Sequence, residues 1–195
     1  MKGRINISLG NTKLGKVPNV SLPAIKTCPP NIPCIKECYC NSDVFYWQMA
    51  REKWEENYQL YQTDPYDYFA QLDKFLLKVK PKFFRFHVSG DAPNQIYVDN
   101  MLVVAAKHFQ TKFLVFTKQF TFNFHEKDIP LPNFKVKYSV WGATIPVKTP
   151  RAWVIPQENI PKGEEVYMGR KVCKGKCDDC YFCWLNNEDV VLIKH

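Results

Sequence analysis

Eight cysteines in two groups are the residues of this sequence whose type and spacing point most directly to chemistry. The N-terminal cysteine group lies in TCPPNIPCIKECYC and consists of Cys28, Cys34, Cys38 and Cys40. The C-terminal cysteine group lies in VCKGKCDDCYFCW and consists of Cys173, Cys177, Cys180 and Cys183. Short spacings between cysteines fold the backbone into tight loops whose thiolates converge on zinc or on an iron–sulfur cluster. The sequence therefore predicts thiolate ligation of a metal.

Three chemistries compete for these cysteines. Disulfides favour an oxidising compartment and scattered cysteines, whereas the first ten residues lack the apolar stretch of a secretory signal. Zinc ribbons usually use two C-x2-C knuckles a dozen or more residues apart. The C-terminal group reads C-x3-C-x2-C-x2-C, which is closer to the dense run of bacterial ferredoxins. We expect an iron–sulfur cluster, [4Fe-4S] in type and one or two in number, with zinc as the alternative. The expected ligands are Cys28, Cys34, Cys38, Cys173, Cys177, Cys180 and Cys183, and Cys40 is either a ligand or a bystander.

Charge and hydropathy indicate whether the protein binds nucleic acid, spans a membrane or is cytoplasmic. The net charge of +8 attracts phosphates, but it is spread along the chain, so nucleic acid is a candidate partner on weak grounds. No run of about 18 uncharged apolar residues is present, so no membrane span is expected. These features favour a cytoplasmic protein, in the host cytoplasm if it is viral.

The pattern of apolar residues predicts alternating strands and helices. Helices are expected from Asp43 to about Tyr61, from Asp64-Pro65 to Pro81, and from the turn at 89–93 through His108. Strands are expected at Ile5–Leu9, Phe83–Val88, Lys112–Thr117, Phe134–Val140, Ala152–Ile155 and Asp189–Lys194. Strand, helix and strand at this spacing predict a parallel sheet. We expect one α/β domain over residues 1–195, with cysteine-rich loops at 28–40 and 173–184 that metal ligation draws together.

Several single residues carry expectations of their own. Asp91 is a candidate N-cap for the helix through His108, and Lys118 ends a parallel strand where ligands bind in α/β sheets. Arg85 and His87 alternate with apolar residues, which predicts that both lie on the polar face of their strand. Trp184 follows the last cysteine, where it would shield a cluster from water. A helical stripe of aromatic residues is expected in the core and comprises Trp47, Trp54, Tyr58 and Tyr61.

Several segments together resemble the gene-product-88 family of small phage and plasmid proteins. They are SLPAIKTCPP with CYC, FRFHVSGD, FLVFTK, YSVWGAT and the final CW, in this order from Ser21 to Trp184. The resemblance implies a viral or plasmid-borne protein whose role, substrate and biological process are unknown. In that family the position of Cys40 is usually not cysteine.

A wider resemblance is to the radical S-adenosylmethionine superfamily, which implies a partial (β/α) barrel; an open, mostly parallel sheet is the alternative fold. Cys34-x3-Cys38-Tyr39 is similar to the start of its cysteine motif, although C-x3-C-x-C stands here in place of C-x3-C-x2-C. Ser89-Gly90-Asp91 matches its glycine-rich loop. S-adenosylmethionine is thus a candidate cofactor, with Ser89, Gly90, Asp91 and Lys118 as candidate contacts.

Three functions follow. The first is an iron–sulfur protein with a structural or redox-active cluster. The second is an active radical enzyme acting on nucleic acid or a small molecule. The third is a zinc-stabilised nucleic-acid-binding protein. The sequence contains no Ser–His–Asp arrangement, P-loop, dinucleotide fingerprint or H-E-x-x-H motif that would add a further enzyme class.

Overall fold

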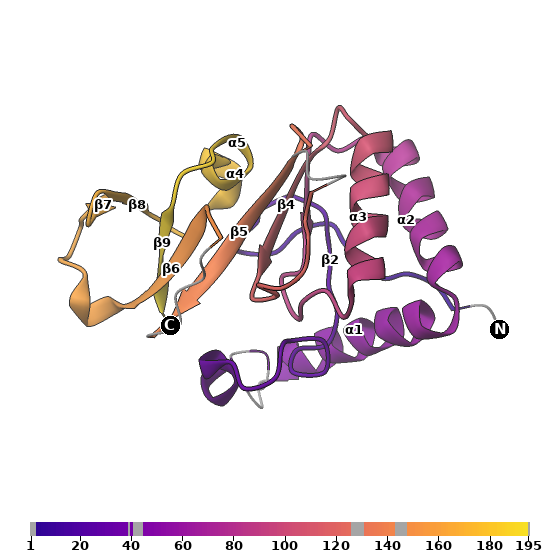
Figure 1. Ribbon diagram of the computed structural model, residues 1–195, viewed down its shortest axis with the longest axis horizontal. Coiled ribbons are helices and arrows are strands. Elements are labelled where there is room, and N and C mark those ends of the chain that lie inside the picture. The colour runs from indigo at the N-terminus through magenta and orange to yellow at the C-terminus, as the bar shows by residue number, and fades with distance from the viewer. Residues whose placement is uncertain (1–2, 39, 41–44, 126–130, 143–147, 195) are drawn as a thin grey trace.

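The computed structural model describes residues 3–38, 40, 45–125, 131–142 and 148–194, without the side chains of residues 45–47. These residues form a nine-stranded sheet in the order β1-β2-β3-β4-β5-β6-β9-β8-β7. The pairs from β2 to β9 and the pair β8–β9 are parallel, whereas β1–β2 and β7–β8 are antiparallel. The expected α/β fold with a mostly parallel sheet is confirmed. The sheet is open, with β1 and β7 at its edges, so the described residues do not show the partial barrel (Figure 1).

The element bounds agree closely with the sequence pattern at the centre of the sheet and less well at its edges. The strands are β1 Ile7–Ser8, β2 Asn19–Val20, β3 Phe83–Phe86, β4 Lys112–Thr117, β5 Phe134–Trp141, β6 Arg151–Pro156, β7 Val166–Tyr167, β8 Arg170–Val172 and β9 Val190–Lys194. The helices are α1 Phe45–Thr63, α2 Pro65–Val79, α3 Gln95–Lys107, α4 Cys177–Cys180 and α5 Phe182–Leu185, with 3-10 turns η1 Pro33–Glu37 and η3 Gln157–Asn159. The short strands β2, β7 and β8 were not expected, because two or three residues carry too little periodicity to identify a strand.

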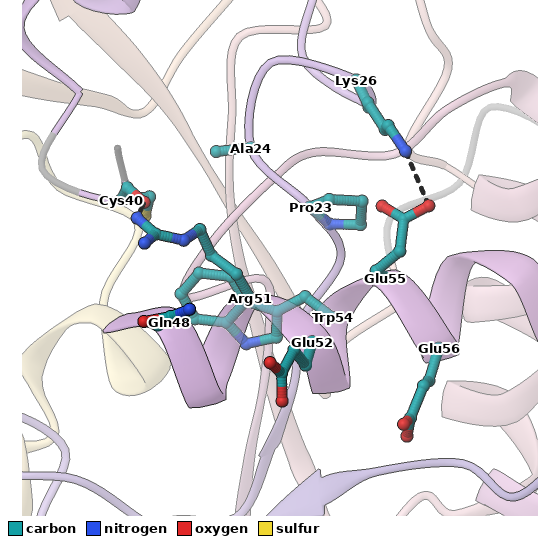
Figure 2. A pocket seen from close by; sticks show the side chains of 10 residues that line it. All are labelled: Pro23, Ala24, Lys26, Cys40, Gln48, Arg51, Glu52, Trp54, Glu55 and Glu56. Carbon is teal, nitrogen blue, oxygen red and sulfur yellow. Dashed lines mark hydrogen bonds and ion pairs between the residues drawn. The ribbon is translucent and has the colours of Figure 1, made fainter. Parts of the chain in front are cut away.

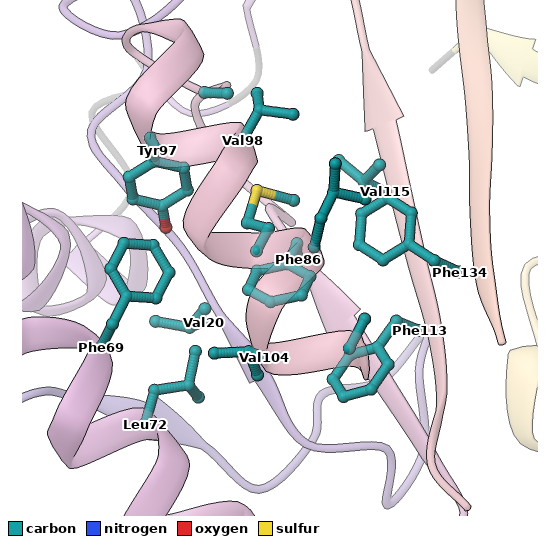
Figure 3. Close-up of a cluster of buried hydrophobic side chains, with 14 of the residues drawn as sticks. Val20, Phe69, Leu72, Phe86, Tyr97, Val98, Val104, Phe113, Val115 and Phe134 are labelled. Carbon is teal, nitrogen blue, oxygen red and sulfur yellow. The ribbon is translucent and has the colours of Figure 1, made fainter. Parts of the chain in front are cut away.

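The main core lies between one face of the sheet and helices α2 and α3 (Figure 3). Phe86 and Phe113 from the strands meet Leu72 of α2 and Val104 of α3, and all four are fully or almost fully buried. Each such side chain contributes about 1.5–3 kcal/mol relative to its exposed state. The helix α1 crosses beneath this layer, beside the carboxyl ends of the strands (Figure 1).

Helix α3 begins later than the sequence suggested. Its N-cap is Asn94, whose Oδ1 accepts a hydrogen bond from the backbone N–H of Tyr97 at 2.9 Å and another from the Tyr61 hydroxyl at 2.8 Å. The expectation that Asp91 caps this helix was therefore wrong. Asp91 was a plausible candidate because Asp and Asn are equally good N-caps, and only tertiary contacts distinguish the two.

Strand β3 ends at Phe86, two residues before the expected end. The backbone of His87 has φ +59°, in the left-handed region, and this reverses the alternation of side chains expected through Val88. The ring of His87 consequently enters the core beside Tyr97, with centroids 5.4 Å apart, and is 2% exposed. Neither ring nitrogen has a hydrogen-bond partner among the described residues. The prediction that His87 lies on the polar face with Arg85 was wrong.

The other face of the sheet is covered by the C-terminal segment of the chain. Helix α5 packs on β4 and β5, and the indole Nε1 of Trp184 donates to the carbonyl of Phe84 at 3.0 Å. Trp184 is buried with Leu14, Val17, Phe83 and Leu114 in a second hydrophobic core. The C-terminal cysteine group is thereby held against the sheet. No helix in the part of the chain that the structure describes is long and apolar enough to cross a membrane.

The buried His87 predicts a specific loss of stability in acid. Burial, aided by the nearby charge of Arg85, lowers the pKa of His87 to about 3, whereas the unfolded chain has a pKa near 6.5. Between these values the unfolded state binds the extra proton, so stability is complete above about pH 6.5 and falls as the pH is lowered. The free energy of unfolding should fall by about 1.4 kcal/mol per pH unit more than in His87→Asn, a residue that tolerates the left-handed backbone. Urea unfolding of both proteins between about pH 7 and about pH 5 checks this. Equal pH dependence in the two proteins would contradict it.

Candidate metal centres

The two cysteine groups lie at opposite ends of the parallel strands. The N-terminal group interacts electrostatically with Asp91 and Lys118, which follow the carboxyl ends of β3 and β4. The C-terminal group interacts with Arg85 and Lys137, under helices α4 and α5. Figure 1 shows the chain near residue 35 at one end of the molecule and α4–α5 at the other. The expectation that metal ligation draws the two loops together was wrong, because the sheet stands between them.

Cys28 is held by a segment that is fastened to the carboxyl end of β3. The backbone N–H of Leu22 donates to the carbonyl of Ser89 at 3.2 Å, and the Thr27 hydroxyl accepts from the N–H of Asp91 at 3.0 Å. The approach is so close that a Cβ on Gly90 would lie 2.5 Å from the carbonyl oxygen of Leu22, and Gly90 also has φ +72°. Gly90 is therefore required by packing between two chain segments.

Cys34 lies within the turn η1, which Pro33 begins, and Cys38 is the C-cap of that turn. Burial raises the pKa of Cys28 to about 11 and also raises that of Cys34. The charge of Lys118 opposes both shifts. Cys34 further raises the pKa of Cys28, and Cys38 further raises that of Cys34. Cys34 thus lies within electrostatic reach of both Cys28 and Cys38. Without a metal, Cys28 and Cys34 are protonated near neutral pH.

Cys40 faces a different neighbourhood. It is 2% exposed, and its backbone carbonyl accepts from Nη1 of Arg51 at 3.0 Å. Figure 2 shows Cys40 lining an open pocket of about 640 Å³ between Pro23 and helix α1, together with Arg51 and Trp54. Cys40 therefore lies against α1.

The same pocket corrects the expectation of an aromatic core stripe on α1. Tyr61 is buried in the main core and Tyr58 packs against it, as expected. Trp54 instead lines the pocket beside Cys40. The side chain of Trp47 lies outside the described residues.

Two of the four candidate cofactor contacts are engaged by the protein itself. The Asp91 carboxylate accepts from the Thr117 hydroxyl at 2.8 Å, the N–H of Ala92 at 2.8 Å and the N–H of Lys118 at 2.7 Å. Burial raises the pKa of Asp91, and these hydrogen bonds oppose that shift. Asp91 joins the end of β4 to the turn after β3, and Gly90 is occupied by the contact with Leu22. Ser89 is buried, and its hydroxyl has no partner among the described residues.

The C-terminal group is arranged by a short break between two helices. Tyr181 has φ +47° and separates α4 from α5, so that Cys177, Cys180 and Cys183 lie around one bend. The N–H of Cys173 donates to the carbonyl of Val191 at 2.8 Å, and that of Cys177 to the carbonyl of Lys13 at 2.9 Å. Strand β9 and the loop at 11–15 therefore fix the backbone that leads into this bend.

Two cations lie beneath this segment, near Cys177 and Cys183. Lys137 of β5 is fully buried, and its ammonium donates to the carbonyls of Asn186 and Glu188. The guanidinium of Arg85 lies 4.7 Å from the ring centroid of Phe116, and its buried Nε has no hydrogen-bond partner among the described residues. Sequence analysis missed Lys137. Its only signal was a charged residue inside an otherwise apolar strand.

The cations lower the pKa values of two thiols of this group, against the effect of burial. Burial raises the pKa of Cys183 to about 12 and also raises that of Cys177. Arg85 opposes both shifts, Lys137 opposes the shift of Cys183, and the neighbouring cysteines add to both. Burial lowers the pKa of Lys137, and Cys183 together with the carboxylates of Asp189 and Glu188 opposes that shift.

Neither cysteine group is closed around a common point. Among the described residues, no group of three or more His, Cys, Asp or Glu side chains is placed to hold a metal ion. All eight cysteines lie in the described part of the chain, and no disulfide joins them there. The structure thus gives each group its position and its electrostatic environment.

A family model, gene product 88, matches residues 3–186. The chain belongs to the gene product 88 family. This confirms the first resemblance seen in the sequence, whereas nothing supports the wider resemblance to radical S-adenosylmethionine enzymes. Neither the curated proteins nor the solved structures contain a match to the chain.

The hydrogen bonds of Asp91 predict a structural role for this residue. Asp91→Ala leaves the Thr117 hydroxyl and the N–H of Lys118 without their buried acceptor, so it should lower the free energy of unfolding by about 1–3 kcal/mol. Asn94→Ala, which removes the true cap of α3, should cost about 1 kcal/mol and serves as the reference. Urea denaturation measures both. An Asp91→Ala protein as stable as the wild type would show that the carboxylate is not needed by the fold.

Proposed function

We propose that this gene product 88 protein is an iron–sulfur protein whose C-terminal cysteine group holds the cluster. The observation that carries the proposal is the pair of cations, Arg85 and Lys137, that interact with the buried thiols of Cys177 and Cys183. Cys173, Cys177, Cys180 and Cys183 would be the ligands. A phage or plasmid protein of this kind acts in the host cytoplasm, where cysteines are kept reduced.

Electrostatics supports an anionic group at this position. A buried charge without a partner costs several kcal/mol, and removal from water is offset only by close opposite charge. A metal centre with four thiolates is negatively charged. It would add negative charge beside Arg85 and Lys137, in addition to that which Asp189 and Glu188 already place near Lys137.

The density of ligands and the burial of Trp184 favour iron–sulfur over zinc. Four cysteines in the short stretch from Cys173 to Cys183 resemble the wrapping of a cluster more than two separate zinc knuckles. Trp184, which is 2% exposed, packs beside Cys177 and Cys183 and would exclude water from one side of the cluster. The contacts of Gly90 and Asp91 within the protein disfavour the radical-enzyme alternative, in which both would contact the cofactor.

The test begins with protein purified without oxygen. We expect broad brown absorption in the visible range, with iron and sulfide bound. Cys180→Ser should lose the C-terminal cluster and become less stable, since ligand binding energy contributes to folding energy. Arg85→Leu keeps the apolar contact with Phe116 and removes the charge, and it should weaken cluster binding by about tenfold.

Lys78→Leu is the matched control, because Lys78 is exposed on α2, which covers the opposite face of the sheet. It should bind iron like the wild type. Colourless protein that contains zinc would exclude the iron–sulfur proposal. Wild-type iron affinity in Arg85→Leu would remove the observation on which the proposal depends.

A second candidate function, nucleic-acid binding, is favoured by the surface around α4 and α5. The ammonium of Lys171 lies 4.9 Å from the ring centroid of Phe182. Lys82 lies 5.6 Å from that of Phe83, which stacks on Tyr181 with centroids 4.0 Å apart. Lysines interleaved with aromatic rings are typical of surfaces that bind phosphates and stack bases. The neighbouring acids Asp178 and Asp179 reduce the positive charge of this surface.

This second function predicts a salt-dependent affinity for DNA. Fluorescence anisotropy of labelled single-stranded and duplex oligonucleotides should give a plot of log affinity against log salt with a negative slope. The double variant Lys82→Ala/Lys171→Ala should reduce that slope by about two, one for each lost phosphate contact. Lys74→Ala/Lys78→Ala on α2 is the control of equal charge. An unchanged slope in the first variant, or no binding at low salt, would refute this function.

A further inference from the structure

We infer that the outer face of helix α3 is a self-association surface, through which two copies of this chain pair in antiparallel orientation about a two-fold axis at Val103. The inference does not depend on metal binding. It rests on the exposure, spacing and charge of four residues of α3, which are Ile96, Asp99, Val103 and Lys107.

Helix α3 carries apolar side chains on the face that turns away from the sheet. Its inner face is buried in the main core through Tyr97, Val98, Met101, Leu102, Val104 and Ala105. Ile96 and Val103 lie two turns apart on the outer face, and both are exposed. Figure 1 shows α3 beside α2 in the outer layer of the molecule. A surface helix normally presents polar residues on its outer face, so this apolar stripe indicates a binding surface.

The apolar surface is widest at the C-terminal end of α3. The Asp73 carboxylate of α2 lies 3.6 Å from Nζ of Lys107 and 2.7 Å from Nε2 of His108, which places the two helices side by side. Leu77 lies one turn beyond Asp73 on α2 and is exposed, as is Phe109, which directly follows the C-cap His108. Exposed apolar side chains thus gather at this end, whereas Ile96 stands near the other end.

The charges on this face identify the partner as a second copy. Asp99 and Lys107 are both exposed, and each lies about 6 Å along the helix axis from Val103, on either side of it. In a symmetric antiparallel pair centred on Val103, Asp99 of each copy lies opposite Lys107 of the other. A parallel pair would place like charges opposite each other, so the charges favour the antiparallel orientation.

The same arrangement matches the apolar ends of the surface and avoids repulsion. It brings the Ile96 end of each α3 to the Leu77 and Phe109 end of the other copy. The chain as a whole has a net charge of +8, which opposes contact between two copies over most of the surface. Helix α3 itself contains one acid and one base, so its outer face is electrically balanced. A second copy therefore fits this face.

Sedimentation velocity of the full chain over a range of concentrations tests the inference. The wild type should change from monomer to dimer as the concentration rises, because one helix face is small compared with the interface of a permanent dimer. Val103→Lys places two like charges together on the axis and should weaken dimerisation about tenfold. Val166→Lys is the matched control, because Val166 on the edge strand β7 is 56% exposed and Val103 is 54% exposed. It should dimerise like the wild type.

An exchange of charges tests the antiparallel register. Asp99→Lys and Lys107→Asp each place like charges opposite one another at two symmetric positions, so each should weaken dimerisation about tenfold. The double variant restores opposite charges and should dimerise within about threefold of the wild type. His108 remains as a partner of Asp73 when Lys107 is replaced, and urea unfolding checks that each variant is folded.

Three outcomes overturn this inference. A wild type that stays monomeric at every concentration would exclude a second copy as the partner of this face. A dimer that persists in Val103→Lys would use a different surface, and a double variant as weak as the single ones would contradict the antiparallel arrangement. If Val103→Lys does not fold, Ile96→Lys on the same face replaces it and should also weaken the dimer.

Discussion

Two positive charges buried on one face of a parallel sheet constrain everything that covers that face. A central parallel sheet must be covered on both sides, because its strands are apolar on both faces. Here α2 and α3 cover one side with apolar residues in the usual way. On the other side the strands present Arg85 and the fully buried Lys137, and the segment that covers them combines apolar contact with negative charge. Trp184 supplies the apolar contact, and Glu188 and Asp189 place negative charge near Lys137.

The direction of the strands explains why the cysteine groups are apart. The N-terminal group follows β2, which runs parallel to β3, so the chain emerges at the carboxyl ends of both strands. The C-terminal group precedes β9, which is parallel to β6, so the chain reaches it at the amino ends. The positions of the two cysteine groups along the sequence do not reveal that they lie at opposite ends of the strands. The relation depends on the order of strands in the sheet, in which β9 is inserted between β6 and β8.

The sequence predicted the strands and helices that have a regular pattern of apolar residues. It did not predict the features that depend on a single tertiary contact or on one backbone angle. Strand β4 was predicted over Lys112–Thr117 and lies there, because six residues bounded by turns carry a clear signal. Asp91 and Asn94 are both good N-caps, and the choice between them was made by Thr117 and Lys118, which are distant in sequence. The reversal at His87 follows from one dihedral angle that no periodicity encodes. For the same reason the cysteines were recognised as groups, but their relation to Arg85 and Lys137 was not.

The two groups also differ in how much their local structure depends on a ligand. Around Cys28 the backbone is fixed by hydrogen bonds to Ser89 and Asp91 that exist without any metal. Helices α4 and α5 have four residues each, far below the length at which a helix is stable alone. Trp184 and two backbone hydrogen bonds anchor this segment, but the bend at Tyr181 is left-handed and costs energy. A metal bound there would contribute to the fold itself, because it would join the bend to the cations beneath it.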